Sequence, residues 1–299
     1  MNSNASQERP LPHIPVMVTE VLEYLNLQPN GMYLDGTIGA GGHATEILNR
    51  LSRNGKLIGI DRDAEALKIC KALLGASARP LLTFQSSYHH FPKVLGQSGI
   101  SAVNGILLDL GLSSIQLDSD SRGFAFESNG KLDMRFDGHS GETAAELMAR
   151  SSEKELADII YQFGEERHSR RIARTIKSLP NLMTVVDLKE AVRRSTSPRQ
   201  RNKSLARVFQ AIRIAVNGEL DKLNAFLECF ADYLTIGGRV VILSYHSLED
   251  RMVKHTFRAL KQSGVLKIIT KKPLVPSPEE QANNSRSRSA KLRVAERIA

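Results

Sequence analysis

The sequence predicts an α/β fold whose parallel sheet is interrupted by a long helical segment. Short apolar runs alternate with helical repeats early in the chain, strand signals are then nearly absent from 113 to 217, and they return afterwards. Strands that alternate with helices are typical of βαβ units. We therefore expect a core formed by residues 1–112 and 218–299, with residues 113–217 as an inserted helical domain.

Four apolar runs in the first part of the core have the length of buried strands. They span 32–38, 57–61, 81–85 and 105–110. Apolar residues at helical spacing in 43–51 and 64–73 predict one helix after each of the first two runs.

Helical periodicity marks three stretches of the inserted segment: 144–148, 153–163 and 205–216. Strand signals return at 239–244, after a glycine pair, and again at 265–270. We expect these strands to complete the sheet. Prolines then lead into the polar and basic stretch 281–289, which predicts a mobile arm.

The composition indicates a folded chain outside membranes. The apolar fraction of 41% and the charged fraction of 24% are near the averages for soluble globular proteins. No apolar run reaches the roughly 18 residues of a membrane span, and residues 1–12 are polar, so we expect a cytoplasmic protein. Cys70 and Cys229 lack the spacing of a zinc site or a disulfide framework, so we expect buried thiols and no metal.

The formal charge of +9 and the pI near 9.6 favour a polyanionic partner, because a positive field attracts phosphate. A merely basic protein would interleave acids with its cations, whereas the insertion and the basic C-terminal arm (286–297) carry stretches of one sign. Few aromatic residues accompany these stretches, which favours folded RNA over a long single strand. The expected RNA contacts are Arg199, Arg201, Lys203, Arg286, Arg288 and Arg293.

A glycine-rich turn follows the first predicted strand and precedes the first predicted helix. Glycines there let the backbone approach a ligand, in the order Asp35-Gly36-Thr37-Ile38-Gly39-Ala40-Gly41-Gly42-His43. Asp61 ends the second strand, where a carboxylate can bind the hydroxyls of a ribose. The turn and the spaced acid together predict a nucleoside cofactor, against the alternative of a tight turn and a helix-capping Asp.

The turn also discriminates between nucleoside cofactors. The Gly-Lys-Ser/Thr sequence of an NTPase is absent. The residues Asp35, Thr37, Gly39 and Gly41 give D-x-T-x-G-x-G, which resembles motif I of class I methyltransferases. An acid here would repel a pyrophosphate but attract the cationic aminoacyl end of S-adenosylmethionine, which is therefore the expected cofactor.

Longer blocks over nearly the whole chain carry a more specific resemblance. They include His13-Ile14-Pro15-Val16-Met17, Gly59-Ile60-Asp61-Arg62-Asp63, Leu107-Leu108-Asp109-Leu110-Gly111-Leu112-Ser113-Ser114-Ile115-Gln116-Leu117-Asp118, Arg122-Gly123-Phe124, Leu132-Asp133-Met134-Arg135 and Ser244-Tyr245-His246-Ser247-Leu248-Glu249-Asp250-Arg251. The chain resembles the bacterial 16S ribosomal RNA cytosine-N4 methyltransferase family of the RsmH or MraW type. This resemblance implies a Rossmann-like class I methyltransferase core with an inserted helical domain. It also implies cofactor contacts from Gly41, Gly42, His43, Asp61, Asp109 and Gln116, with Tyr88 where the family usually has Phe.

The target atom is expected to be an exocyclic nitrogen. Methyl transfer from a sulfonium to a neutral amine requires mainly proximity and alignment, without a covalent intermediate. Methylation of a pyrimidine ring carbon usually needs a cysteine nucleophile, and neither cysteine lies near a motif. Asp109 ends the fourth predicted strand, where it either contacts the cofactor or accepts a hydrogen bond from the target amine.

Two further positions are candidates for the target site. Many amino methyltransferases have Asp/Asn-Pro-Pro-Tyr after the fourth strand, whereas this chain has Asp109-Leu110-Gly111-Leu112, so the orientation of the amine stays open. Tyr245 and His246 can stack on or bind a flipped base, with a purely structural histidine as the alternative for His246. We expect an ordinary ion pair between Asp133 and Arg135.

The expected function is direct N4-methylation of a decoding-centre cytidine in 16S ribosomal RNA. The resemblance implies that the partner is an assembled small ribosomal subunit. A methyltransferase for protein amines or DNA is one alternative, and it would act without ribosomal RNA. An RNA chaperone without catalysis is the other. The sequence does not indicate an oligomeric state.

Overall fold

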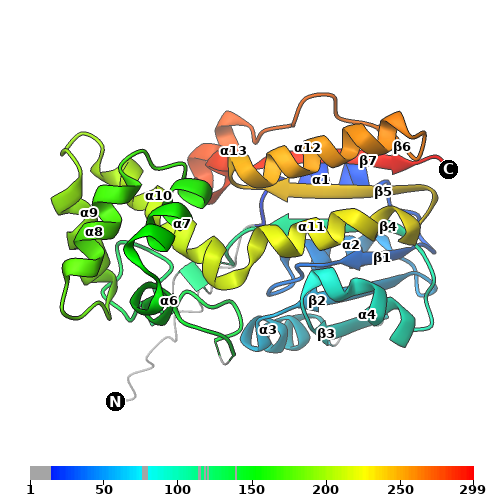
Figure 1. Cartoon of the computed structure of the whole chain (residues 1–299). Coiled ribbons are helices and arrows are strands. Elements are labelled where there is room, and N and C mark those ends of the chain that lie inside the picture. The colour runs from blue at the N-terminus through cyan, green and yellow to red at the C-terminus, as the bar shows by residue number, and fades with distance from the viewer. Residues whose placement is uncertain (1–14, 76–79, 114–115, 118, 120, 139) are drawn as a thin grey trace, which may run out of the picture.

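The computed structural model describes residues 15–75, 80–113, 116–117, 119, 121–138 and 140–299. In this part of the chain, seven strands form one sheet in the order β3-β2-β1-β4-β5-β7-β6 (Figure 1). The strands are β1 (Met32–Asp35), β2 (Lys56–Asp61), β3 (Leu81–Gln85), β4 (Val103–Leu110), β5 (Leu234–Ser244), β6 (Leu266–Ile268) and β7 (Lys291–Arg297). The predicted α/β fold is confirmed. The polar start 1–12 and the motif residues His13, Ile14, Ser114, Ile115 and Asp118 lie outside the described residues.

The strand order contains a switch point between β1 and β4. The chain first builds β1, β2 and β3 towards one edge and then returns to place β4 and β5 on the other side of β1. These five strands are parallel, whereas β7 runs antiparallel between β5 and β6. In such sheets, ligands bind outside the carboxyl ends of the strands at the switch point.

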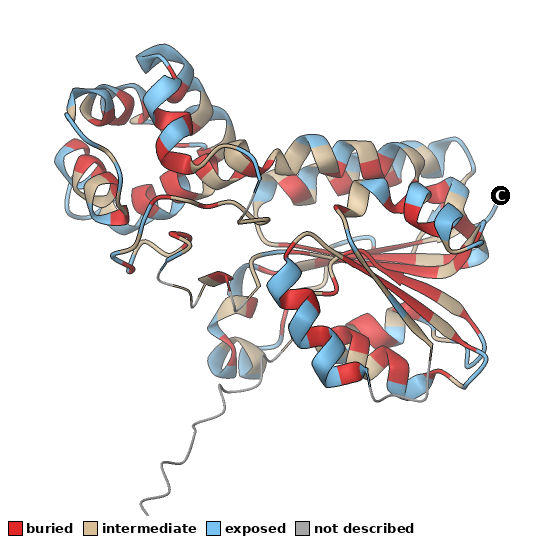
Figure 2. Ribbon diagram, turned by 90° about the horizontal axis from the view of Figure 1, so that it is seen from below, coloured by how far each residue is buried: buried red, intermediate tan, exposed pale blue. Residues whose placement is uncertain are grey.

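A layer of helices covers each face of the sheet. One layer consists of α1 (Val18–Leu25), α2 (Gly42–Arg50) and α3 (Ala64–Leu74). The other consists of α4 (Phe91–Gln97), α11 (Glu219–Cys229) and α12 (Ser247–Gln262), with the short helices η1 (Tyr88–His90) and η2 (Phe230–Tyr233). Figure 2 shows the buried residues on the strands and on the helix sides that face them. Cys70 is fully buried and Cys229 is half-buried, both as free thiols.

The helices of the inserted segment pack around a core of their own. They are α6 (Ala144–Arg150), α7 (Glu153–Gly164), α8 (Ser169–Ser178), α9 (Val185–Ser195) and α10 (Arg201–Asn217). Their apolar cluster draws its buried residues only from between Phe124 and Ile212, and it lies to the left of the sheet in Figure 1. Capping boxes start α6, α7 and α9, because a Ser or Thr precedes each helix and an acid follows three residues later. None of the helices in the described residues is both long and apolar enough to cross a bilayer.

The junction between α10 and α11 connects this helical cluster to the sheet. Gly218 makes the turn with φ 57°, a conformation that favours glycine. The Asn217 side chain donates to the carbonyl of Met134 (2.7 Å) and accepts from the amide of Phe136 (2.8 Å). Across the turn, Arg213 donates to both oxygens of Glu219 at 2.9 Å. These bonds hold the helical cluster in a defined orientation above the strand ends.

The C-terminal segment differs from the mobile arm that its composition predicts. Residues after the prolines form α13 (Pro278–Asn283), the short helix η3 (Ser285–Ser289) and β7, which lies between two other strands. Leu292, Val294 and Ala295 of β7 are buried in the core. Arg293 pairs with Asp250 of α12, with 2.6 Å between Nε and Oδ1. The expected arm is therefore wrong, because alternating apolar residues among the basic ones join the sheet.

Two strand boundaries also differ from the expectation. β1 ends at Asp35 rather than at 38, because the chain turns into the glycine-rich loop. β5 begins at Leu234, so the glycine pair Gly237-Gly238 lies within the strand instead of before it. A register irregularity between Val103 and Gly105 of β4 accompanies this stretch.

We expect Arg293→Ala to lower the free energy of unfolding by about 3 kcal/mol, because Asp250 then stays in the interior with only Lys291 nearby, at 3.6 Å. Chemical denaturation of the purified proteins measures this change. Arg288→Ala, at an exposed position, is the control and should shift stability by less than about 0.5 kcal/mol. Equal losses in the two variants would contradict the structural role of Arg293.

Candidate active site

A cavity of about 320 Å³ lies at the carboxyl ends of β1, β2, β4 and β5. Residues singled out by the sequence supply much of its lining: Gly39, Gly42, His43, Asp61, Tyr88, Asp109, Gln116, Tyr245 and Arg286. Asp35, Gly41 and His246 are not among the lining residues. The tertiary structure thus gathers motifs from both ends of the chain at the switch point of the sheet.

The glycine-rich turn is held by the acids of the neighbouring strands. Asp61 accepts from the amide of Gly39 (2.8 Å), and Asp35 accepts from the amide of Thr37 (3.1 Å). Gly39 has φ 53° and its Cβ position is open, so its backbone can approach a ligand. Gly41 has φ 95° and packs against Cys70, where a Cβ would lie 3.2 Å from the sulfur. A side chain at Gly41 would therefore disturb the packing of the turn against α3.

Three carboxylates, Asp35, Asp61 and Asp109, gather around this turn. Burial raises the pKa of Asp35 to about 7, and the charges of Asp109 and Asp61 add to this effect. Burial likewise raises the pKa of Asp61 to about 6. Within the described residues, no Lys or Arg lies within ion-pair distance of these three acids. The site is therefore built to receive a cation.

Asp109 is held by partners from three other segments. Its amide donates to the Thr37 hydroxyl (2.7 Å), and its Oδ1 accepts from the Tyr245 hydroxyl (2.7 Å). Its Oδ2 lies 3.7 Å from Nδ1 of His43, whose Nε2 is 2.9 Å from the carbonyl of Val16. Burial raises the pKa of Tyr245 well above its usual value, and the Asp109 charge reinforces this, so the phenol stays a donor.

A further acid, Asp63, connects the strand end that carries Asp61 to the inserted segment. Gln116 donates to Asp63 (3.3 Å), as does Arg122 (3.2 Å). Arg122 also donates to the carbonyls of Arg135 and Phe136. Sequence reasoning missed both roles, although Asp63 and Arg122 stand in the blocks that carry the family resemblance.

Tyr88 forms part of the opposite wall. Its ring meets Phe226 edge-on, with 6.0 Å between centroids, and its hydroxyl lies 3.4 Å from the carbonyl of Glu219. The ring thus offers an aromatic surface to the cavity while its polar end is bonded to α11.

His246 belongs to a cluster with Glu219 and Glu249 whose spacing is compatible with a metal site. His246 caps α12, because its Nδ1 accepts from the amide of Glu249 (3.4 Å). In the neutral ring Nε2 then carries the hydrogen and has no lone pair for a metal, and it lies 3.2 Å from Glu249 without forming a hydrogen bond. Glu219 is already neutralised by Arg213. These contacts favour the structural alternative for His246 over binding of a base.

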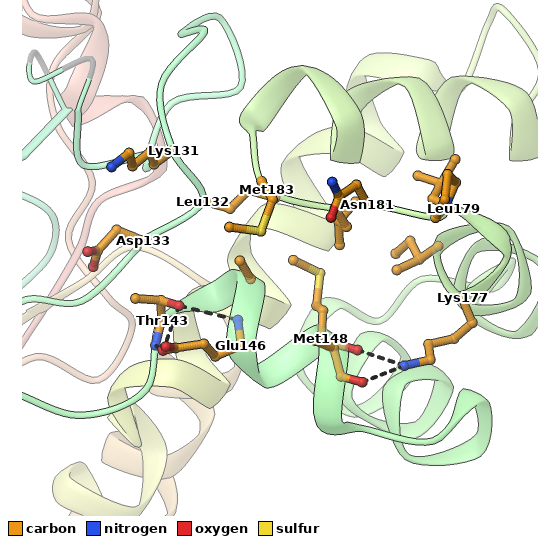
Figure 3. Close-up of a pocket in the computed structure, with 15 residues that line it drawn as sticks. Lys131, Leu132, Asp133, Thr143, Glu146, Met148, Lys177, Leu179, Asn181 and Met183 are labelled. Carbon is orange, nitrogen blue, oxygen red and sulfur yellow. Dashed lines mark hydrogen bonds between the residues drawn. The ribbon is translucent and has the colours of Figure 1, made fainter.

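A larger cavity of about 490 Å³ lies within the helical cluster (Figure 3). Two of its charged groups are already bonded, since Lys177 donates to the carbonyls of Met148 and Ala149, and Glu146 belongs to a capping box. Asp133 forms the predicted ion pair with Arg135, at 2.7 Å, which is confirmed. This cavity is larger, but among its described residues it lacks a cluster of carboxylates without cationic partners such as the one beside the smaller cavity.

The predicted RNA contacts divide into two groups. Arg199, Lys203 and Arg288 are exposed, and Arg201 and Arg286 are half-buried, with Arg286 at the rim of the smaller cavity. Arg293 is different, because its side chain is 9% exposed and bonded to Asp250. Its assignment as an RNA contact is therefore wrong.

We expect the apo-protein to lose stability as pH rises through the raised pKa of Asp35. A carboxyl with a folded-state pKa of about 7 and an unfolded value of 3.8 favours folding at low pH, and this contribution is lost towards pH 7. Asp35→Asn, which keeps an acceptor for Thr37, should therefore be about 1–2 kcal/mol more stable than the wild type at pH 8 and nearly equal at pH 5. Urea unfolding at both pH values measures this. The prediction is contradicted if the stability difference between Asp35→Asn and the wild type is the same at pH 5 and pH 8. Asp158→Asn, at an exposed position, is the control.

The comparisons with known proteins agree with this site. The model of the MraW methylase family matches residues 10–298. Proteins named ribosomal RNA small subunit methyltransferase H are 48% identical over 292 residues in Kosmotoga olearia (96% of this chain, 97% of that protein), and 47% identical over 290 residues in Thermosipho africanus (96% and 98%). A third, from Sorangium cellulosum, is 44% identical over 291 residues (96% and 91%). The chain therefore belongs to the MraW methylase family, and its methyl donor is S-adenosylmethionine.

Proposed function

We propose that the protein methylates the exocyclic N4 amine of a decoding-centre cytidine in 16S ribosomal RNA. The observation that carries this proposal is the cavity itself. It joins the acidic glycine-rich turn to Asp109 and Tyr245 at the ends of β4 and β5, beneath the basic helical insertion.

The residues present fit S-adenosylmethionine. Asp61, at the end of β2, is placed to bind the ribose hydroxyls, and Tyr88 offers an aromatic face for the adenine. The uncompensated acids Asp35 and Asp109 favour the cationic methionine end. When bound, the cofactor supplies an electrophilic methyl group on a sulfonium.

The placement of the cysteines supports nitrogen rather than ring carbon as the acceptor. Cys70 is buried behind Gly41, and burial raises the pKa of its thiol to about 11, so it stays protonated. Cys229 lies at the end of α11 and bonds to that helix. Neither thiol lines the cavity. Asp109 offers the acceptor oxygen that an amine needs instead.

The charge of the insertion supports an RNA substrate. Arg170 and Arg171 are exposed on α8, whereas Arg174 pairs with Glu153 at 3.2 Å and Lys177 donates to backbone carbonyls of α6. Arg199 and Lys203 extend this basic surface to the start of α10. The similar proteins are named for the small ribosomal subunit. We infer that the insertion holds the phosphate backbone while one cytidine enters the cavity, since a paired base cannot present its amine.

The proposed function is tested first by removing the protein. Ribosomal RNA from cells with and without it is digested and its nucleosides are compared by mass spectrometry. Loss of N4-methylcytidine from the small subunit, restored by the wild-type chain, is the expected result. A complete set of methylated nucleosides in the deleted cells would refute the proposal and favour a protein or DNA substrate.

The form of the substrate is tested with purified components. We expect faster methyl transfer to isolated small subunits than to short oligonucleotides of the same sequence, because only folded RNA reaches both the insertion and the cavity rim. Radiolabelled methyl transfer at equal cytidine concentration measures both rates. Comparable rates would exclude a requirement for the assembled subunit.

Asp61→Asn should weaken S-adenosylmethionine binding about 10- to 100-fold, because hydrogen bonds to a charged group are worth roughly 1.5–3 kcal/mol. Asp61 accepts from the amides of both Gly39 and Asp63, at 2.8 Å each, and the single amide oxygen of Asn keeps one of these bonds, so urea unfolding of the variant is measured alongside its affinity. Calorimetry measures the affinity, and Asp158→Asn is the control. Unchanged affinity would remove Asp61 from the cofactor site.

Replacing Arg199 and Lys203 together by Ala should weaken RNA binding and reduce the slope of log affinity against log salt by about 2, at one phosphate contact each. Cofactor affinity should not change. The charge-matched control replaces Lys261 and Lys267, which are exposed at the far end of α12 and on β6. The same slope in both double variants would mean that this surface does not face the RNA.

A further inference from the structure

His43 has two ring nitrogens with different surroundings. Nε2 lies 2.9 Å from the carbonyl oxygen of Val16, in a residue that is 6% exposed. A carbonyl oxygen only accepts hydrogen bonds, so Nε2 carries a hydrogen. In the neutral ring the lone pair is therefore on Nδ1, which faces Asp109.

Asp109 presents one oxygen to His43 and the cavity. Its Oδ1 accepts from Tyr245, whereas its Oδ2 lies 3.7 Å from Nδ1 of His43. Both residues line the cavity. A lone pair and a carboxylate that face each other repel, and a single proton between them removes the repulsion. The pair thus has a place for one proton, next to the bound substrate.

We propose that His43 and Asp109 together receive the proton that the target amine loses during methyl transfer, with Nδ1 of His43 as its final position. This inference rests on the proposed function, because it requires an N–H group as the acceptor of the methyl group. It assigns His43 a role beyond contact with the cofactor.

The step balances with the groups present. The N4 lone pair forms the new N–C bond as the C–S bond breaks and its electron pair stays on sulfur. One N4–H bond then breaks, and its electron pair remains on nitrogen as the neutral methylamino group. The proton goes to Oδ2 of Asp109 and, once the 3.7 Å between Oδ2 and Nδ1 closes to hydrogen-bond distance, on to Nδ1 of His43. No oxidant, reductant or metal is required.

The surrounding charges favour this order of events. The ionisable groups that interact electrostatically with this region come from five elements: Asp35 from β1, Asp61 from β2, Tyr245 from the end of β5, Glu249 from α12 and Glu280 from α13. A sulfonium in the site and a positive charge on His43 repel each other, so the cofactor's charge opposes transfer of a proton to His43 until the methyl group has left. After transfer the sulfonium charge is gone, and an imidazolium replaces it among the same acids.

The first test observes the histidine directly in the wild-type protein. Nitrogen NMR of ¹⁵N-histidine-labelled protein is recorded against pH with S-adenosylhomocysteine, a neutral thioether, or with sinefungin, whose amine mimics the sulfonium charge. We expect Nδ1 of His43 to become protonated at higher pH in the thioether complex. Identical titrations in the two complexes, or a hydrogen on Nδ1 rather than Nε2 in the neutral ring, would overturn the proposal.

The second test is kinetic and uses His43→Gln, whose amide nitrogen can still donate to the Val16 carbonyl. Single-turnover methyl transfer at saturating cofactor should fall about 10- to 100-fold, with cofactor affinity by calorimetry changed less than about threefold. The rate should also lose the pH dependence that the imidazole confers. His255→Gln, exposed on α12, is the control and should match the wild type.

Two outcomes of this variant would overturn the role of His43. One is a rate within threefold of the wild type, and the other is a rate loss fully explained by weaker cofactor binding. The wild-type product is identified by mass spectrometry in the same experiment. Absence of N4-methylcytidine there would refute the proposed function, whereas its presence with an unaffected His43→Gln rate would refute only this inference.

Discussion

The burial of Asp35 and Asp61 beside Asp109 is the constraint on which the site depends. Three acids from three neighbouring strands meet at one edge of the sheet without a Lys or Arg to pair them in the described residues. Hydrogen bonds to the turn and to Thr37 and Tyr245 hold them there. Burying these carboxylates without a cation lowers the stability of the apo-protein. A cationic methyl donor near them would reduce that cost.

The remainder of the site places a large helical insertion over this acidic edge. Asp63 holds Arg122, which in turn holds the carbonyls before the first helix of the insertion. Asn217 bonds the same stretch from the end of α10, and Glu165 of the insertion accepts from Ser247 at the start of α12. The basic surface of the insertion and the cavity at the strand ends are thus joined through short polar contacts.

The two cavities of the described structure differ in whether their charged groups have partners, and this difference matters more than their volumes. In the larger one, Lys177, Glu146 and Asp133 already have partners of their own. The smaller one has carboxylates that lack cationic partners and a histidine whose Nδ1 faces an acid. The arginines also differ in their pairing. Arg293 forms an ion pair with Asp250 inside the protein, whereas Arg199 is exposed to solvent. Charge counted along the chain does not make this distinction.

The sequence by itself determined the α/β class, the glycine-rich turn, the spaced acid Asp61 and the family, because these depend on periodicity and on residues close together in the chain. It did not show that residues 291–297 form an inner strand, since basic residues obscure their apolar alternation. Nor did it decide that His246 caps a helix while His43 faces Asp109. Only the tertiary structure decided these points, because the partners of a buried polar group come from segments that are distant in sequence and meet only when the sheet is assembled.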